Sequence, residues 1–136
     1  MTYKAVLFDV DGTLVDNVNI CTAAYRETLL RCTGRRYTDE EITRHYGKTE
    51  EGILAVYVGP AELPGVVETY FAVYSELHRA VPAPFPGMYE LLSGLQGQVK
   101  LGVVTGKSLR LAEVTLRELG LLDYFLVIEG GFVDRA

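Results

Sequence analysis

The sequence contains no tryptophan and only two cysteines, two histidines and two methionines among its 136 residues. It also lacks long hydrophobic runs. The longest stretches without a charged residue, 52–61 and 80–89, have ten residues each, about half the length of a membrane-spanning helix. The N-terminus reaches Asp9 without the apolar region of a secretory signal. These absences predict a cytoplasmic protein that makes no contact with a membrane.

An excess of positive charge is also missing. The chain has 13 Lys and Arg against 18 Asp and Glu, which gives a net charge of −5, and its basic residues are scattered. Nucleic acids are bound by clustered basic residues, so we expect no nucleic-acid partner. A phosphate group on a small ligand would instead be bound locally, by a metal ion, a few cations or helix N-termini.

Two cysteines lie in one predicted helix. Cys21 and Cys32 are eleven residues apart, about 16 Å along a helix axis, which excludes a disulfide between them. The rest of the composition is ordinary: 49% of residues are hydrophobic and 23% are charged. This is typical of a folded chain, and the length allows one domain or one small domain with an insertion.

Apolar periodicity and turn residues predict the organisation of the chain. Three apolar runs indicate buried strands, and between the first two lies a long helical block without a strand. The alternation predicts an α/β fold, a doubly wound parallel sheet with its site at the carboxyl ends of the strands. We expect one domain from residues 1–16 and 81–136 and a helical cap from 17–80, joined by a proline-rich connection. The expected strands are 4–8, 99–105 and 125–128, and the expected helices are 19–32, 39–46, 50–58, 64–79, 88–95 and 107–119.

A pair of carboxylates follows the first strand directly. Asp9 and Asp11 are separated by one residue and followed by Gly12 and Thr13. Alternate residues of an extended chain point the same way, so both carboxylates can face one ligand. Two close negative charges favour a bound cation, and oxygen ligands favour Mg²⁺. Gly12 allows a tight turn and can direct its N–H to an anion.

Three segments together resemble a known family. Residues 8–16, FDVDGTLVD, resemble the first motif of the haloacid dehalogenase-like hydrolase superfamily. Residues 103–107, VVTGK, are similar to its second motif, and 85–92, FPGMYELL, to the helix before it. The helical block corresponds to the family's inserted cap. Within the superfamily, the chain looks most like phosphoglycolate phosphatase and its relatives, so the resemblance implies a Rossmann-like core.

The resemblance implies a role for each motif residue. Asp9 is the expected nucleophile, which forms an aspartyl-phosphate, and Asp11 the expected general acid and base. Thr105 would bind the phosphoryl group together with the N–H groups of Gly12 and Gly106. Mg²⁺ would be held by the Asp9 carboxylate and the Asp11 main-chain carbonyl. The implied activity is Mg²⁺-dependent hydrolysis of a small phosphorylated metabolite.

Two lysines are candidates for substrate contact. Lys48 follows a glycine in the predicted cap, and Lys107 is expected at a helix start, where its side chain could equally be solvated. The acidic residue at position 11 argues against a dehalogenase, because a halide leaving group needs no proton. A phosphosugar mutase of the β-phosphoglucomutase type keeps both aspartates and stays an alternative.

Two further motifs of the family are absent from the sequence. They are a Lys in a turn soon after the third strand and an acidic pair at the end of the following strand, and no Lys follows Lys107. We therefore expect this chain to correspond to the N-terminal part of such an enzyme and to be inactive alone. Residues 4–8 would then form an exposed sheet edge. A non-catalytic, self-associating fragment is the third interpretation.

Overall fold

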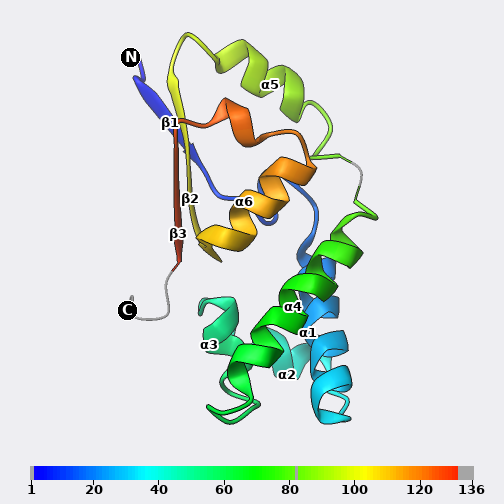
Figure 1. Ribbon diagram of the computed structural model, residues 1–136. Coiled ribbons are helices and arrows are strands. Elements are labelled where there is room, and N and C mark those ends of the chain that lie inside the picture. The colour runs from blue at the N-terminus through cyan, green and yellow to red at the C-terminus, as the bar shows by residue number, and fades with distance from the viewer. Residues whose placement is uncertain (1, 82, 132–136) are drawn as a thin grey trace.

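The computed structural model describes residues 2–81 and 83–131 and divides into a sheet with its helices and a group of cap helices (Figure 1). Three parallel strands form the sheet in the order β1-β2-β3. They are β1 (Ala5–Phe8), β2 (Lys100–Ser108) and β3 (Val127–Gly131). The predicted parallel α/β fold is thus confirmed, with an incomplete sheet of three strands among the described residues.

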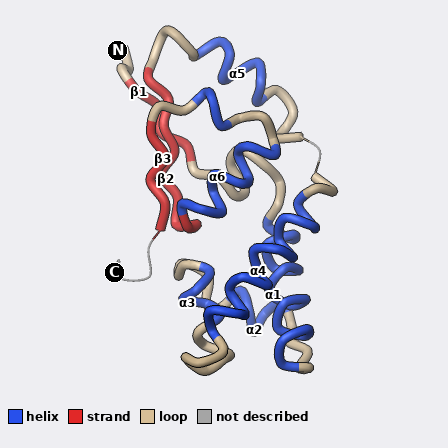
Figure 2. The backbone as a smooth tube through the Cα atoms, in the orientation of Figure 1, coloured by secondary structure: helices blue, strands red, loops and turns tan. Residues whose placement is uncertain are grey.

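Helices cover one face of this sheet. α5 (Met88–Leu95) and α6 (Leu109–Glu118) lie on the same side of the strands (Figures 1 and 2), and the 3₁₀ turn η1 (Leu122–Tyr124) follows α6. Both connections between neighbouring strands place their helix on this side, as expected of successive parallel strands added in one direction. Aliphatic side chains fill the space between: Val10, Leu14, Val15, Leu92, Leu101, Val103, Leu116, Leu119 and Leu121, with Phe125. We call this group the sheet cluster.

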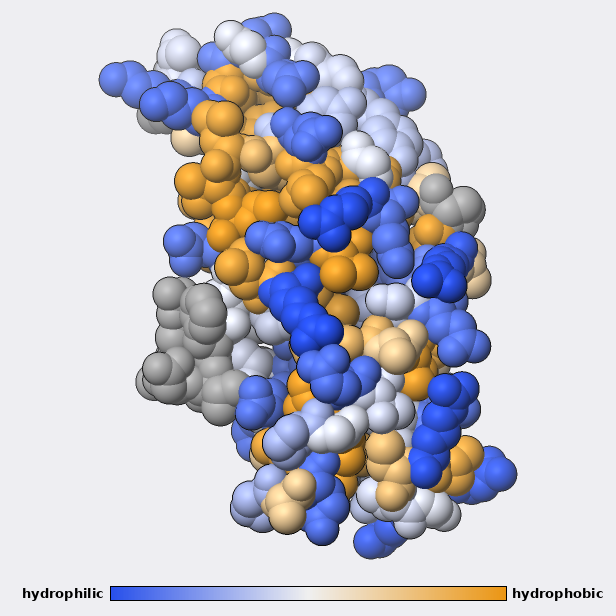
Figure 3. Space-filling model, in the orientation of Figure 1, coloured by the Kyte–Doolittle hydropathy of each residue, from blue (hydrophilic) through white to orange (hydrophobic). Residues whose placement is uncertain are grey.

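The other face of the sheet is uncovered in the described residues. Val6 and Phe8 pack against the sheet cluster, whereas Leu7 between them is 64% exposed and Val127 on β3 is 54% exposed. The prediction of a buried first strand is therefore wrong for alternate residues, because side chains on a strand alternate between faces and only one face carries helices. Hydrophobic residues gather over the strands in the space-filling view (Figure 3).

Four helices beyond the carboxyl ends of the strands form the cap (Figure 1). They are α1 (Val18–Thr33), α2 (Asp39–Thr43), α3 (Glu50–Leu54) and α4 (Leu63–His78). The cap has its own hydrophobic cluster, which we call the cap cluster: Cys21, Ala24, Tyr25, Leu29, Ile42, Ile53, Leu54, Val66, Tyr70, Val73 and Tyr74, together with Leu111 of α6. No helix within residues 2–81 and 83–131 is long and apolar enough to span a bilayer.

Local capping signals set the starts of the short cap helices. Thr38 accepts a hydrogen bond from the Glu41 N–H (3.1 Å), and Thr49 accepts one from the Gly52 N–H (3.2 Å). Both threonines thereby satisfy N–H groups that the first turn of a helix leaves unpaired. The helix predicted to begin after Thr49 ends earlier than expected, at Leu54, and continues as turns.

The second strand and the helix after it differ from the prediction. β2 extends to Ser108 rather than 105, and α6 begins at Leu109 rather than 107, with Ser108 as its N-cap. The pairing of β2 with β3 is irregular between Val104 and Ser108, where four steps along β2 correspond to two along β3. This bulge keeps residues 105–107 extended at the end of the strand, a common device beside functional sites.

Candidate active site

A cavity of about 310 Å³ lies between the carboxyl ends of the strands and the cap. Six of the seven site residues expected from the sequence line it: Asp9, Asp11, Lys48, Thr105, Gly106 and Lys107. The core side supplies the ends of β1 and β2, and the cap side supplies the turn before α3. Loops at the carboxyl ends of parallel strands meet at one edge of a sheet, so segments about 95 residues apart in the chain share this cavity.

The two aspartates differ in their surroundings. The Asp9 side chain is exposed, and its Oδ1 accepts a hydrogen bond from the Val10 N–H (2.7 Å). The Asp11 carboxylate is 26% exposed and accepts hydrogen bonds from Asn17 Nδ2 (2.6 Å) and from the Lys107 ammonium (2.9 and 3.0 Å). Asp9 is thus available for a ligand in the cavity, whereas Asp11 is already held by two neighbours.

The predicted phosphate-binding residues lie near these carboxylates. Thr105 is buried, and its Oγ1 accepts the Lys107 N–H (3.2 Å). Gly12 has a φ of 76°, as the expected turn requires, but it donates its N–H to the Val15 carbonyl (2.8 Å) rather than toward an anion. Gly106 belongs to β2 and not to a helix N-terminus, because α6 begins only at Leu109.

The two candidate lysines prove to be opposites. Lys48 is exposed in the turn before α3. Lys107 was expected at a helix start, where its side chain could be solvated. Both expectations are wrong, because Lys107 lies in β2 and its side chain is only 4% exposed. The cause is the extension of β2, in which alternate residues share a face. Thr105 and Lys107 are both buried, whereas Gly106 between them is exposed.

Electrostatics favour a charged lysine and a protonated thiol in this cavity. Burial by itself lowers the pKa of Lys107, but Tyr74 and the Asp11 carboxylate outweigh it and hold this pKa well above its usual range. Burial raises the pKa of Cys21 to about 11, an effect that the nearby Lys107 only partly opposes. Cys21 is therefore a neutral side chain at pH 7 and no nucleophile.

The donors present fit part of a Mg²⁺ site. Asp9 and Asp11 offer carboxylate and main-chain carbonyl oxygens, the ligands that Mg²⁺ prefers. Within the described part of the chain, no group of three or more His, Cys, Asp or Glu residues is arranged to hold a metal ion. The described residues therefore provide one side of an oxygen site at the end of β1.

A buried polar network behind Asp11 has no counterpart in the sequence motifs. Asn17 at the start of α1 leaves its own helix uncapped and directs Nδ2 to Asp11, to the Tyr74 hydroxyl (3.3 Å) and to His78 Nε2 (3.3 Å). Tyr74 also hydrogen bonds to Thr115 of α6 (2.9 Å). Asn17 stands at a position where a side chain normally caps the helix, so its sequence position indicates a capping role. Only the folded structure shows that it is buried and bound to Asp11 instead.

A second contact across the cavity also escaped the sequence analysis. Glu50, the first residue of α3, is buried, and its two carboxylate oxygens lie 3.2 and 3.0 Å from the Ser108 nitrogen, whose N–H they accept. This joins the cap to the start of α6. An acidic residue in the first turn of a helix is ordinary, so the sequence offers no sign of its contact with the core.

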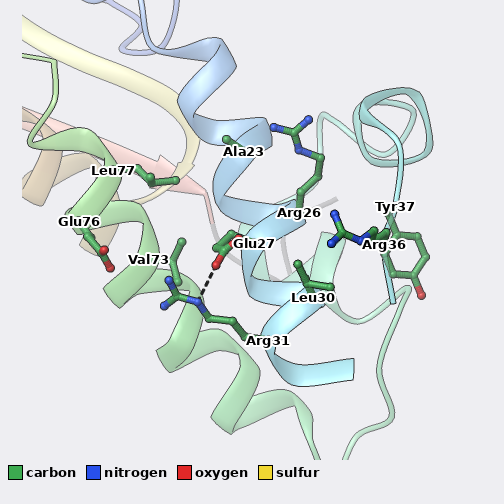
Figure 4. Close-up of a pocket in the computed structure, with 10 residues that line it drawn as sticks. All are labelled: Ala23, Arg26, Glu27, Leu30, Arg31, Arg36, Tyr37, Val73, Glu76 and Leu77. Carbon is green, nitrogen blue, oxygen red and sulfur yellow. Dashed lines mark hydrogen bonds and ion pairs between the residues drawn. The ribbon is translucent and has the colours of Figure 1, made fainter. Parts of the chain in front are cut away.

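A larger hollow of about 520 Å³ lies on the outer side of the cap between α1 and α4 (Figure 4). It contains none of the expected site residues. Arg31 pairs with Glu27 (2.8 Å) along α1, and Arg26 pairs with Asp39 of α2 (2.6 Å). These pairs are exposed ions that neutralise each other, which is typical of a solvated helix surface. The hollow therefore does not compete with the cavity at the strand ends.

The fold and this cavity define a capped parallel α/β protein with paired carboxylates at the end of its first strand. The chain belongs to the haloacid dehalogenase-like hydrolase family, whose model matches residues 6–132.

Individual relatives with different names match most of this chain. Phosphoglycolate phosphatase of Aquifex aeolicus is 29% identical over 129 residues, which are 94% of this chain and 61% of the relative. Tyrosine-protein kinase PtkA of Mycobacterium tuberculosis is 30% identical over 134 residues, 96% of this chain and 45% of the relative. The chain thus spans roughly half to three fifths of these relatives.

A solved structure agrees in fold. CbbY of Rhodobacter sphaeroides, crystallised in complex with phosphate, superposes with a TM-score of 0.79 at 23% sequence identity. The match covers 94% of this chain and 63% of that chain. The likeness extends over both the sheet and the cap.

Proposed function

We propose that this chain carries the nucleophile and the acid–base residue of a phosphomonoester hydrolase of the phosphoglycolate phosphatase type. The observation that carries the proposal is the meeting of Asp9, Asp11 and Thr105 in one cavity under the cap. The family and the Aquifex aeolicus phosphatase support the same activity. A small phosphorylated metabolite suits a cavity of about 310 Å³.

The proposed reaction has two displacements at phosphorus. An Asp9 carboxylate oxygen forms a bond to phosphorus as the bond to the leaving oxygen breaks, and Asp11, which must begin the cycle in its protonated form, donates its proton to that oxygen. Asp11 then takes a proton from water, whose oxygen attacks phosphorus and releases Asp9 and inorganic phosphate. Thr105 would donate its hydroxyl hydrogen to a phosphoryl oxygen.

The proposal includes Mg²⁺, held by the Asp9 carboxylate and the Asp11 main-chain carbonyl. Its chemical contribution when bound would be to neutralise phosphoryl charge. The Asp9 side chain is exposed, and it takes part in none of the ion pairs that the described residues form. Its charge is therefore available to a metal ion, which supports this assignment.

Phosphate release from small phosphomonoesters tests the proposal. The assay uses this chain and a version extended by the C-terminal region that its longer relatives carry, each with Mg²⁺ and with a chelator. We expect Mg²⁺-dependent hydrolysis in the extended version and its loss in Asp9→Asn, because an amide does not attack phosphorus. Asp16→Asn is the matched control, since Asp16 is exposed on the same loop and does not line the cavity.

Two outcomes would contradict the proposal. Full activity in Asp9→Asn would remove the nucleophile assignment. Rapid isomerisation of β-glucose 1-phosphate with little free phosphate would instead favour a phosphosugar mutase, which returns the phosphoryl group to the sugar.

We also propose that the chain associates with a second copy of itself through β1. Its support is the position of β1 at one end of the strand order and the exposure of Leu7 within this strand. Strand edges with free N–H and C=O groups are templates for pairing with another chain. The test of this proposal is whether association of two chains requires Leu7, as described in the Discussion.

A further inference from the structure

We propose that Lys107 is a positioning residue of the active site, which holds the Asp11 carboxylate turned toward the cap and makes no contact with the substrate. This inference rests on the proposed function, in which Asp11 is the acid and base of the reaction. It assigns to Lys107 a role different from the substrate contact that the sequence suggested.

The contacts of the ammonium group are the first step. Lys107 Nζ lies 2.9 Å from Asp11 Oδ1 and 3.0 Å from Oδ2, so it binds both oxygens of the carboxylate. It also lies 4.4 Å from the centre of the Tyr74 ring and 3.8 Å from Cys21 Sγ. An ammonium group has three hydrogens to donate. The carboxylate, the ring and the thiol surround them, which leaves no donor for a substrate.

The surroundings hold this arrangement in place from three elements. The lysine stem leaves β2 on its buried side. Tyr74 projects from α4 of the cap, and its hydroxyl is hydrogen bonded to Thr115 of α6 (2.9 Å). Asn17 at the start of α1 donates a hydrogen bond to Asp11 Oδ1 (2.6 Å), an oxygen that Lys107 also binds. The Asp11 carboxylate is therefore fixed between a cation and an amide rather than free to rotate.

Burial explains why the pair depends on both partners. A buried ammonium loses its hydration and persists only with a compensating charge. The Lys107 side chain is 4% exposed, whereas that of Asp11 is 26% exposed. Water can reach Asp11 when the lysine is replaced, so removal of the cation releases the carboxylate instead of stranding it. Misplacement of a reacting group by about 1 Å costs on the order of a hundredfold in rate.

Lys48 supplies the natural comparison. It lines the same cavity from the cap, is exposed, and forms no ion pair among those of the described residues. An exposed lysine at a cavity wall is free to meet an anion, whereas a buried, saturated one is not. The two lysines therefore differ in role, although each is a cation at the same cavity.

Carbon NMR of the carboxyl groups tests the positioning role directly in the 136-residue chain. Aspartate is labelled with ¹³C at Cγ, and the Asp11 resonance is identified by its loss in Asp11→Asn. We expect this resonance and the Asn17 side-chain amide resonances to move in Lys107→Met and in Lys107→Gln, but not in Lys48→Met. The Asp16 resonance is the internal reference. In Asp11→Asn, the Lys107 Nζ resonance should move in turn.

Binding of inorganic phosphate with Mg²⁺, measured by calorimetry, separates positioning from ligand contact. Because Lys107 has no donor free, its replacement should change phosphate affinity by less than about twofold, whereas Lys48→Met should weaken it more. An Asp11 resonance that stays in place in both Lys107 variants would overturn the inference. A large loss of phosphate affinity in both Lys107 variants would also overturn it, because Lys107 would then be a ligand contact.

The two proposals fail separately. If the version extended by the C-terminal region binds no phosphate with or without Mg²⁺, the proposed function loses its support, while the Asp11 resonance still decides the role of Lys107. Should either variant unfold, as judged by circular dichroism, the Lys107 Nζ resonance in Asp11→Asn reports the same contact from the other side. An Nζ resonance that stays in place there would overturn the inference.

Discussion

The cap cluster and the sheet cluster bury hydrophobic side chains in different ways. The cap cluster is enclosed by helices and centred on tyrosines, with the rings of Tyr25 and Tyr70 stacked 4.4 Å apart. The sheet cluster is aliphatic and enclosed on one side, so Leu7 and Val127 lie exposed on the other face of the same strands. The cap therefore satisfies its own hydrophobic surface, whereas the sheet leaves apolar area for another contact.

The cavity at the strand ends lies between these two regions and depends on both. Asp9 and Thr105 come from the sheet side, and Lys48 and Tyr70 come from the cap. Polar contacts such as that of Glu50 with Ser108 join the two sides near the cavity, together with the apolar Leu111 of α6, which packs in the cap cluster. This arrangement suits a site that must admit water and a charged ligand, while the apolar clusters on each side keep their own elements rigid.

The largest expected effect on stability is a cavity in the cap cluster. Tyr70 is fully buried and stacked on Tyr25, so Tyr70→Ala should lower the free energy of unfolding by about 3–5 kcal/mol, as large aromatic truncations do. Urea unfolding followed by circular dichroism measures it. Val56→Ala, at an exposed cap position, is the control. A loss no larger than that of the control would show that the cap cluster is not a separate core.

The next largest effect concerns the link between the regions. Glu50→Gln should cost about 1 kcal/mol, because a charged acceptor for the part-buried Ser108 N–H is replaced by a neutral one that forms a weaker hydrogen bond. Unfolding is followed separately by tyrosine fluorescence, which reports mainly on the cap, and by circular dichroism. Glu51→Gln changes the exposed neighbour and should be silent. Equal effects of the two substitutions would contradict a specific link between cap and core.

A pH effect on stability should distinguish the buried polar network behind Asp11, which includes His78, from both hydrophobic clusters. Burial lowers the pKa of His78 from 6.5, with Lys107 acting in the same direction. The unfolded state then binds a proton more readily than the folded state, so stability is full above pH 6.5 and decreases as the pH falls below it. The slope for one proton is at most about 1.4 kcal/mol per pH unit. Glu118, whose pKa is raised by burial, has the opposite effect nearer pH 4.5.

His78→Gln is the matched variant for this prediction. Unfolding midpoints in urea at pH 7.5 and pH 5.5 should differ for the original chain and differ less for the variant. If both chains lose the same stability between these values, the neutral state of His78 is not the cause.

The smallest effect on stability is expected at the open face of the sheet. Leu7→Lys replaces a 64% exposed side chain and should change the free energy of unfolding by no more than about 0.5 kcal/mol. It should nevertheless shift the chain from an associated form to a monomer in light scattering. Val56→Lys, on the exposed surface of the cap, should leave association unchanged. A monomeric original chain would remove the proposal of self-association.

Local signals in the sequence predicted most elements well. Apolar runs located the first two strands, but the third begins two residues later than expected, at Val127 rather than 125, and extends to Gly131. Thr38 and Thr49 marked the starts of two cap helices because a side-chain oxygen at that position satisfies free N–H groups. The helix over 88–95 begins and ends as predicted. Each of these signals acts within a few residues of its own position, so it can be recognised in the sequence without knowledge of the tertiary structure.

The motif residues could be selected from the sequence, since Asp9 and Asp11 come directly after β1 and Thr105 lies near the end of β2, and the carboxyl ends of parallel strands meet at one edge of a sheet. The environment of each residue could not be predicted. The burial of Lys107 depends on a bulge in the pairing of β2 with β3, and the contact between Asn17 and Asp11 depends on how α1 leaves the sheet.

The sequence by itself thus determined the class of fold, the starts of α2, α3 and α5 and the identity of the residues at the strand ends, because periodicity, capping and turn chemistry are local properties of the chain. Only the tertiary structure decided which face of the sheet is covered, that Lys107 binds Asp11 instead of solvent, and that Glu50 joins the cap to α6. These outcomes depend on the approach of segments about 60 to 100 residues apart. Whether a side chain is buried, and which partner it binds, is decided only when these distant segments come together in the folded chain.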